Sequence, residues 1–136
     1  MRSVFVFMAG LLLCGCSGEP APLVAADVVL TKIRPGAEAR AGYFSLTNTS
    51  GEPIVITAVS SPQFEAVEMH ESVLEDGVSR MRALEKVTIA PDQTIKFEPG
   101  GRHLMLMRPT GATGTVTLHF LAGEAPLLSV TAAVGG

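Results

Sequence analysis

Apolar and polar residues alternate in short stretches along much of this chain, and this pattern predicts β-strands. In residues 115–121, Val116, Leu118 and Phe120 share one face of such a strand, while His119 lies with two threonines on the other. Gly, Pro, Asn or Asp separates the stretches, and none of them shows the 3.6-residue period of an amphipathic helix. The expected strands span residues 24–33, 43–48, 54–60, 66–72, 78–84, 87–89, 94–97, 103–108, 115–121 and 127–133.

Many short strands joined by tight turns are typical of an all-β protein, and here they predict a two-sheet β-sandwich with Greek-key connections. Glu75-Asp76-Gly77 is a hairpin signal, and it joins the strands expected at 66–72 and 78–84. No linker or repeat follows residue 24, and 136 residues leave room for one domain. We therefore expect a single sandwich domain over residues 24–136.

The first residues have the pattern of an export signal. Arg2 supplies a positive charge, and the apolar segment 4–13 is too short to cross a membrane as a permanent helix. Leu13-Cys14-Gly15-Cys16 then resembles the lipobox of bacterial lipoproteins, with Cys16 as the acylated residue. The sequence therefore predicts a protein of the periplasm or another extracytoplasmic space.

Acylation of Cys16 predicts a membrane tether, because a lipid chain on that residue holds the domain at a membrane surface. We expect residues 1–15 to be a lipoprotein-type signal peptide and residues 16–23 to be the tether. The alternative is an ordinary secretory signal that is cut near Ser17.

Composition and charge exclude several classes of function. The formal net charge is −3, with no basic run, so nucleic-acid binding is not expected. Both cysteines, Cys14 and Cys16, precede the expected domain, which excludes from it the Cys-containing blue-copper site of electron-transfer cupredoxins. Glu65, Glu68 and Glu71 surround His70, but no paired-carboxylate or Ser–His–Asp arrangement stands out, so we do not expect an enzyme.

Histidine and methionine carry the candidate chemistry. Beyond the signal segment, these two residue types cluster between residues 69 and 107. His103 and Met105 are two residues apart on one expected strand, so they share a face and lie about 7 Å apart at their bases. His70 and Met81 lie on the two strands of the expected hairpin, which can bring them together.

A set of two imidazoles and two thioethers favours Cu(I) over zinc, calcium or magnesium, because thioether sulfur is a soft, neutral donor. Thioethers also form no disulfides, which suits a copper site in an oxidising compartment. To pass its ion on, such a site is expected at the surface, where its ligands contribute little to the core.

The ligand spacing resembles that of the periplasmic PCu(A)C copper chaperones, which supply the CuA site of cytochrome c oxidase. The motif H-x10-M-x21-H-x-M is carried by His70, Met81, His103 and Met105. The short sequences that flank these residues also resemble that family, including Met69-His70-Glu71 and the run from Pro99 to Met107. The resemblance covers residues 24–133.

This resemblance implies a cupredoxin-like sandwich that binds one Cu(I) per chain through His70, Met81, His103 and Met105. It also implies copper exchange with cytochrome c oxidase or another copper chaperone. Two alternatives stay open, a periplasmic copper buffer or resistance protein and a β-sandwich binding module without metal. Met69 and Met107 are expected in the core or at the rim of the site, and His119 at the surface.

Overall fold

The computed structural model describes residues 21–111 and 114–134, and Cys16 with the expected signal peptide lies outside them. In the described part, no helix is long and apolar enough to cross a membrane. The strands are β1 (Leu23–Leu30), β2 (Ala39–Asn48), β3 (Ile54–Ile56), β4 (Ala58–Ser60), β5 (Phe64–Glu75), β6 (Val78–Ala83), β7 (Val87–Ile89), β8 (Thr94–Phe97), β9 (Arg102–Pro109), β10 (Thr115–Ala122) and β11 (Ala125–Ala133).

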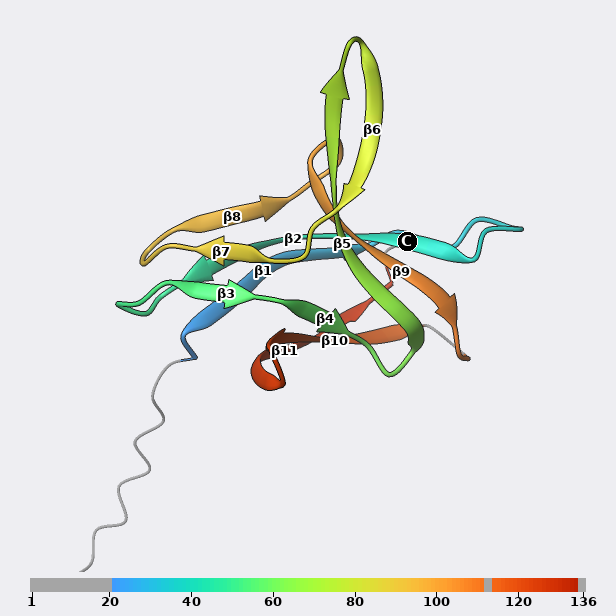
Figure 1. Ribbon diagram of the computed structural model, residues 1–136. Helices are drawn as coiled ribbons and strands as arrows, with labels where there is room; N and C mark the ends of the chain where they lie inside the picture. Colours follow the sequence, from blue (N-terminus) through green and yellow to red (C-terminus); the bar gives the residue numbers. More distant parts are fainter. Residues whose placement is uncertain (1–20, 112–113, 135–136) are drawn as a thin grey trace, which may run out of the picture.

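These strands form an antiparallel sandwich with a cupredoxin-like fold, as the sequence predicts (Figure 1). The larger sheet has the order β1-β2-β9-β5-β6, and β8 also pairs with β2. A three-stranded sheet, β11-β10-β4, and a two-stranded sheet, β3-β7, make up the rest. Neighbours such as β2 and β9 are far apart in sequence, which is typical of Greek-key connections.

The expected strands match those of the structure closely, apart from some of their ends and one division. β1 ends at Leu30, three residues earlier than expected. The stretch at 54–60 is divided at Thr57, whose backbone N–H and hydroxyl both bond to the Leu121 carbonyl. β2 begins earlier than expected, at Ala39, and β5 extends in both directions to Phe64–Glu75. β1 begins at Leu23, a fully buried residue that we placed in the tether.

The core lies between the layers and is built from the alternation seen in the sequence. On β10, the inner residues Val116, Leu118 and Phe120 are at most 1% exposed. On β9, the fully buried Leu104 and Leu106 alternate with His103 and Met105, which lie on the other face of the sheet. One face of β9 therefore contributes to the core, and the other face carries the candidate ligands His103 and Met105.

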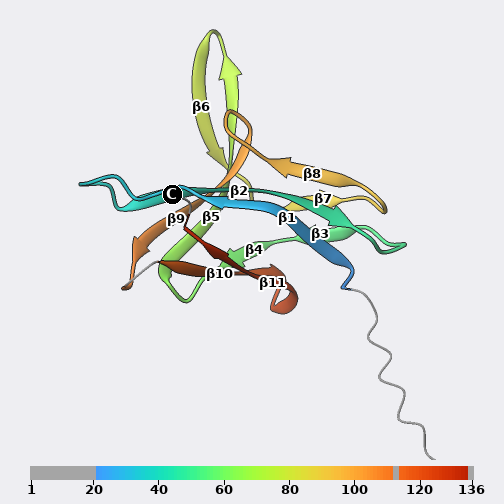
Figure 2. The ribbon, with the colours of Figure 1, turned by 180° about the vertical axis from the view of Figure 1, so that it is seen from behind.

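The β5–β6 hairpin projects beyond the two layers of the sandwich (Figures 1 and 2). Asp76 and Gly77 close it with positive φ angles of 51° and 76°, as a two-residue hairpin turn requires. All six residues of β6 are exposed, while the β5 residues near the sandwich are partly buried. The hairpin thus carries Met81 away from the core on a strand that is paired on one side only.

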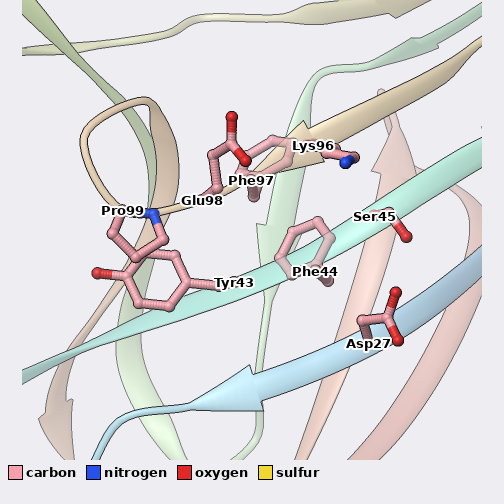
Figure 3. A pocket seen from close by; sticks show the side chains of 8 residues that line it. All are labelled: Asp27, Tyr43, Phe44, Ser45, Lys96, Phe97, Glu98 and Pro99. Carbon is pink, nitrogen blue, oxygen red and sulfur yellow. The ribbon is translucent and has the colours of Figure 1, made fainter.

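A pocket of about 170 Å³ opens between β1, β2 and β8, at a distance along the sheet from this hairpin (Figure 3). The stacked rings of Phe44 and Phe97, 4.5 Å apart at their centroids, form part of its wall. None of the four predicted copper ligands lines this pocket.

Candidate copper site

The strand register places all four predicted ligands on the outer face of the larger sheet. His70 on β5 lies directly opposite His103 on β9, and Glu68 lies opposite Met105. Met81 on β6 lies opposite Ser72, two residues along β5 from His70. Since directly paired residues point to the same side of a sheet, His70, Met81, His103 and Met105 share one face.

His103 is held by the turn that precedes β9. Gly100 adopts a φ of 82°, and Gly101 N–H donates to the Glu98 carbonyl, so the chain reverses tightly before Arg102. The Gly101 carbonyl then accepts from the Ser72 N–H at 3.1 Å and from His103 Nδ1–H at 3.1 Å. Both ring neighbours, the Gly101 carbonyl and the Met81 thioether sulfur, can only accept. Because the carbonyl oxygen is the stronger acceptor, we assign the proton of neutral His103 to Nδ1 and the lone pair to Nε2.

That lone pair faces the sulfur of Met81, with His103 Nε2 and Met81 Sδ only 3.1 Å apart. Two donors that share one metal ion, at bond lengths of about 2.0 Å to nitrogen and 2.3 Å to sulfur, lie roughly 3.5 Å apart. A metal ion therefore needs only a small displacement of the Met81 side chain, which is 61% exposed and free to move.

His70 stands beside this pair, with its ring centroid 5.9 Å from that of His103 and the rings nearly perpendicular, at 76°. Its Nε2 lies 3.0 Å from a carboxylate oxygen of Glu68. Its Nδ1 is buried and has no hydrogen-bond partner. A buried polar atom without a partner costs about 1–3 kcal/mol, so this nitrogen is suited to a bound ion.

Met105 lies one step further along the same face, beside Ala41 of β2 and opposite Glu68. It is half-buried and lines a depression of about 270 Å³ that also includes Thr31, Lys32 and Tyr43. His70, Met81 and His103 thus converge in the structure, and Met105 flanks them next to His103.

The burial of the site differs from the expectation of a purely surface site. Met81 is exposed, but His103 is only 6% exposed and belongs to the packed part of the sandwich. The reason is that β9 lies between β2 and β5 in the sheet, whereas β6 is an edge strand. Met69 is 5% exposed and part of the core, as expected from its place beside His70.

Glu68 is the site residue that we did not assign from the sequence. Its carboxylate reaches His70 because residues two apart on a strand share a face. The signal was present as Glu68-Met69-His70, an acid and an imidazole on either side of a core methionine. Within the described residues, no group of three or more His, Cys, Asp and Glu side chains could hold a metal ion.

The chain belongs to the LpqE-like family, described as "Putative lipoprotein LpqE-like", which matches residues 23–134. Two curated relatives are similar over part of their length. RP573 of Rickettsia prowazekii is 31% identical over 49% of this chain, and "Putative lipoprotein Lxx21020" of Leifsonia xyli subsp. xyli is 32% identical over 70%. The chain spans only 38% and 61% of these two relatives.

Solved structures share the fold. The copper-bound PCuAC domain from PmoF2 matches with a TM-score of 0.66 at 17% identity, covering 83% of this chain and 92% of that domain. The solution structure of CuI-DR1885 from Deinococcus radiodurans matches with a TM-score of 0.62 at 25% identity, covering 89% of this chain and 82% of the other. These neighbours are copper-binding domains and not enzymes.

Proposed function

We propose that this protein binds one Cu(I) ion outside the cytoplasm and delivers it to the CuA site of a respiratory oxidase. The ligands in this proposal are His70, Met81, His103 and Met105. The observation that carries it is the grouping of three of these side chains: His103 Nε2 lies 3.1 Å from Met81 Sδ, and the ring of His70, whose buried Nδ1 has no hydrogen-bond partner, lies 5.9 Å from the ring of His103. The copper-bound state of two proteins with this fold supports the same conclusion.

The donor set favours Cu(I), because sulfur from thioethers is soft and imidazole is intermediate, while no thiolate is available in the described part of the chain. Release is favoured by the unequal exposure of the ligands. Met81, which is 61% exposed, is the ligand that a donor atom of the partner replaces first. The buried His103 is the last ligand to dissociate from the copper ion.

Copper binding is tested by anaerobic titration of the purified chain against a competing Cu(I) chelator. We expect one equivalent of Cu(I), bound by orders of magnitude more tightly than Zn(II). X-ray absorption should report both sulfur and nitrogen neighbours. Equal affinity for zinc, or no tight Cu(I) binding at all, would leave a β-sandwich module without a copper function.

Delivery is tested separately from binding, because a copper buffer uses the same ligands. The Cu(I)-loaded protein is mixed with a metal-free CuA domain, the two are separated, and copper is measured in each. Movement of copper to the CuA domain supports a chaperone. Retention on the loaded protein indicates a copper buffer.

We also propose that residues 1–15 are a lipoprotein-type signal, that Cys16 is acylated and that residues 16–22 tether the domain, which begins with β1 at Leu23. The lipobox-like sequence and the lipoprotein description of the family support this. In a bacterial host, Cys16→Ser should leave the precursor unprocessed and abolish partitioning into detergent. Unchanged maturation and partitioning would exclude the anchor.

A further inference from the structure

The hydrogen-bond partners of the two histidines in the candidate copper site favour opposite tautomers. His103 donates from Nδ1 to the Gly101 carbonyl, so its lone pair is on Nε2. His70 meets an acceptor at the other nitrogen, because Nε2 lies 3.0 Å from the Glu68 carboxylate. An ionised carboxylate only accepts, so Nε2 of His70 carries the proton and Nδ1 carries the lone pair.

From this difference we infer that His70 binds copper through Nδ1, and that Glu68 is the positioning residue that keeps His70 in the required tautomer. The inference rests on the proposed copper function and adds to it the identity of the donor atoms. Nδ1 is the ring nitrogen of His70 that is left without a partner, and it is buried.

The ring geometry fits one shared ion. Two imidazoles that bind a metal at about 2 Å through nitrogen have ring centroids roughly 5 to 6 Å apart. The observed separation between His70 and His103 is 5.9 Å. An ion held by Nδ1 of His70 would lie close to β5, because Nδ1 is the ring nitrogen nearer the backbone, and His103 on the paired strand β9 would hold it through Nε2.

Glu68 has the usual properties of an outer partner in a metal site. Metal-binding histidines commonly donate their second N–H to a carboxylate or a backbone carbonyl, which fixes the ring and makes the bound nitrogen more basic. Here His70 has the carboxylate and His103 has the carbonyl. The Glu68 side chain is 52% exposed, so its position reflects the contact with His70 rather than burial in the core.

The tautomers are measured by long-range nitrogen–proton NMR on the metal-free full chain. We expect a proton on Nε2 of His70 and on Nδ1 of His103. Silver(I), a diamagnetic ion with similar ligand preferences, then identifies the binding nitrogens through nitrogen–silver coupling. The coupling should appear at Nδ1 of His70 and at Nε2 of His103.

Substitution of Glu68 supplies the second arm of the test. Glu68→Ala should mix the His70 tautomers and weaken Cu(I) binding by about 10- to 100-fold. Glu68→Gln keeps an acceptor oxygen, so it should restore the Nε2–H tautomer and most of the affinity. Glu65→Ala is the matched control on the same strand, because its carboxylate pairs with Arg108 at 2.6 Å outside the site.

Silver coupling at Nε2 of His70, or unchanged tautomers in Glu68→Ala, would overturn this inference and leave the proposed function intact. Failure of the unaltered chain to bind Cu(I) or silver(I) would overturn both together. Because the tautomers are read first in the unaltered chain, poor folding of Glu68→Ala does not remove the test.

Discussion

β9 contributes two of the proposed copper ligands and β6 contributes one, yet the two strands differ greatly in burial. β9 is an inner strand with Leu104 and Leu106 fully buried on one face and His103 nearly so on the other. β6 is an edge strand with every residue exposed. The site thus joins a fixed ligand to a movable one.

This difference separates stability from binding. Substitutions of buried residues on β9 should lower the free energy of unfolding of the metal-free protein. Substitution of the proposed ligand on β6 should lower copper affinity alone. His103 belongs to both groups, because it lies in the packed sheet and faces the sulfur of Met81. Substitutions along the two strands test this separation.

The largest expected effect on stability comes from the inner face of β9. Leu106→Ala removes a fully buried side chain and should lower the free energy of unfolding by about 2–5 kcal/mol, measured by denaturant titration of the metal-free protein. Leu74→Ala is the matched control on the hairpin, where the same residue type is 76% exposed, and its effect should stay within about 0.5 kcal/mol. Equal losses in both variants would show that the hairpin is part of the cooperative core.

An intermediate effect is expected at His103. His103→Ala removes a buried ring and its hydrogen bond to the Gly101 carbonyl, which should destabilise the metal-free protein by about 1–3 kcal/mol. The same change should cause the greatest loss of Cu(I) affinity among the proposed ligands, as judged by chelator competition. His119→Ala is the control. The ring of His119 on β10 forms a hydrogen bond with Ser129 on β11, away from the site. Full Cu(I) affinity in His103→Ala would exclude this residue as a ligand.

The strands were predictable from sequence because alternation and turn residues are local signals. Asp76-Gly77 illustrates this, since the pair of positive φ angles follows from the residue types themselves. The division at Thr57 was not predictable, because it depends on bonds to Leu121, which is distant in sequence. Pairing between strands that are distant in sequence has no signal in the local sequence of either strand.

The candidate site was predictable as a set of residue types at fixed spacings, but its geometry was not. The sequence indicates that His103 and Met105 share a face, and the register of β5 against β9 then adds His70 opposite His103. The burial of His103 depends on the place of β9 inside the sheet, so the sequence alone suggested more exposure. The role of Glu68 required the contact with His70 to be seen.

The smallest expected effect on stability comes from Met81, where methionine at two positions gives a direct comparison. Met81→Ala removes a side chain that is 61% exposed, so the metal-free protein should lose less than about 0.5 kcal/mol. Met69→Ala removes the same atoms from a residue 5% exposed in the core and should cost about 2–5 kcal/mol.

The two methionine variants should show the reverse order in copper binding. Met81→Ala takes away the sulfur that lies 3.1 Å from His103 Nε2, so Cu(I) affinity should fall while a weaker site on the remaining donors persists. Met69→Ala should leave affinity unchanged in the fraction that is folded, because Met69 points to the opposite face of β5. The decisive measurement is a pair of values for each variant, the melting temperature without metal and the Cu(I) affinity by competition. If Met81→Ala lowers the melting temperature by more than about 10 °C, as the loss of a buried side chain does, then Met81 is a packing residue and the four-ligand site is wrong.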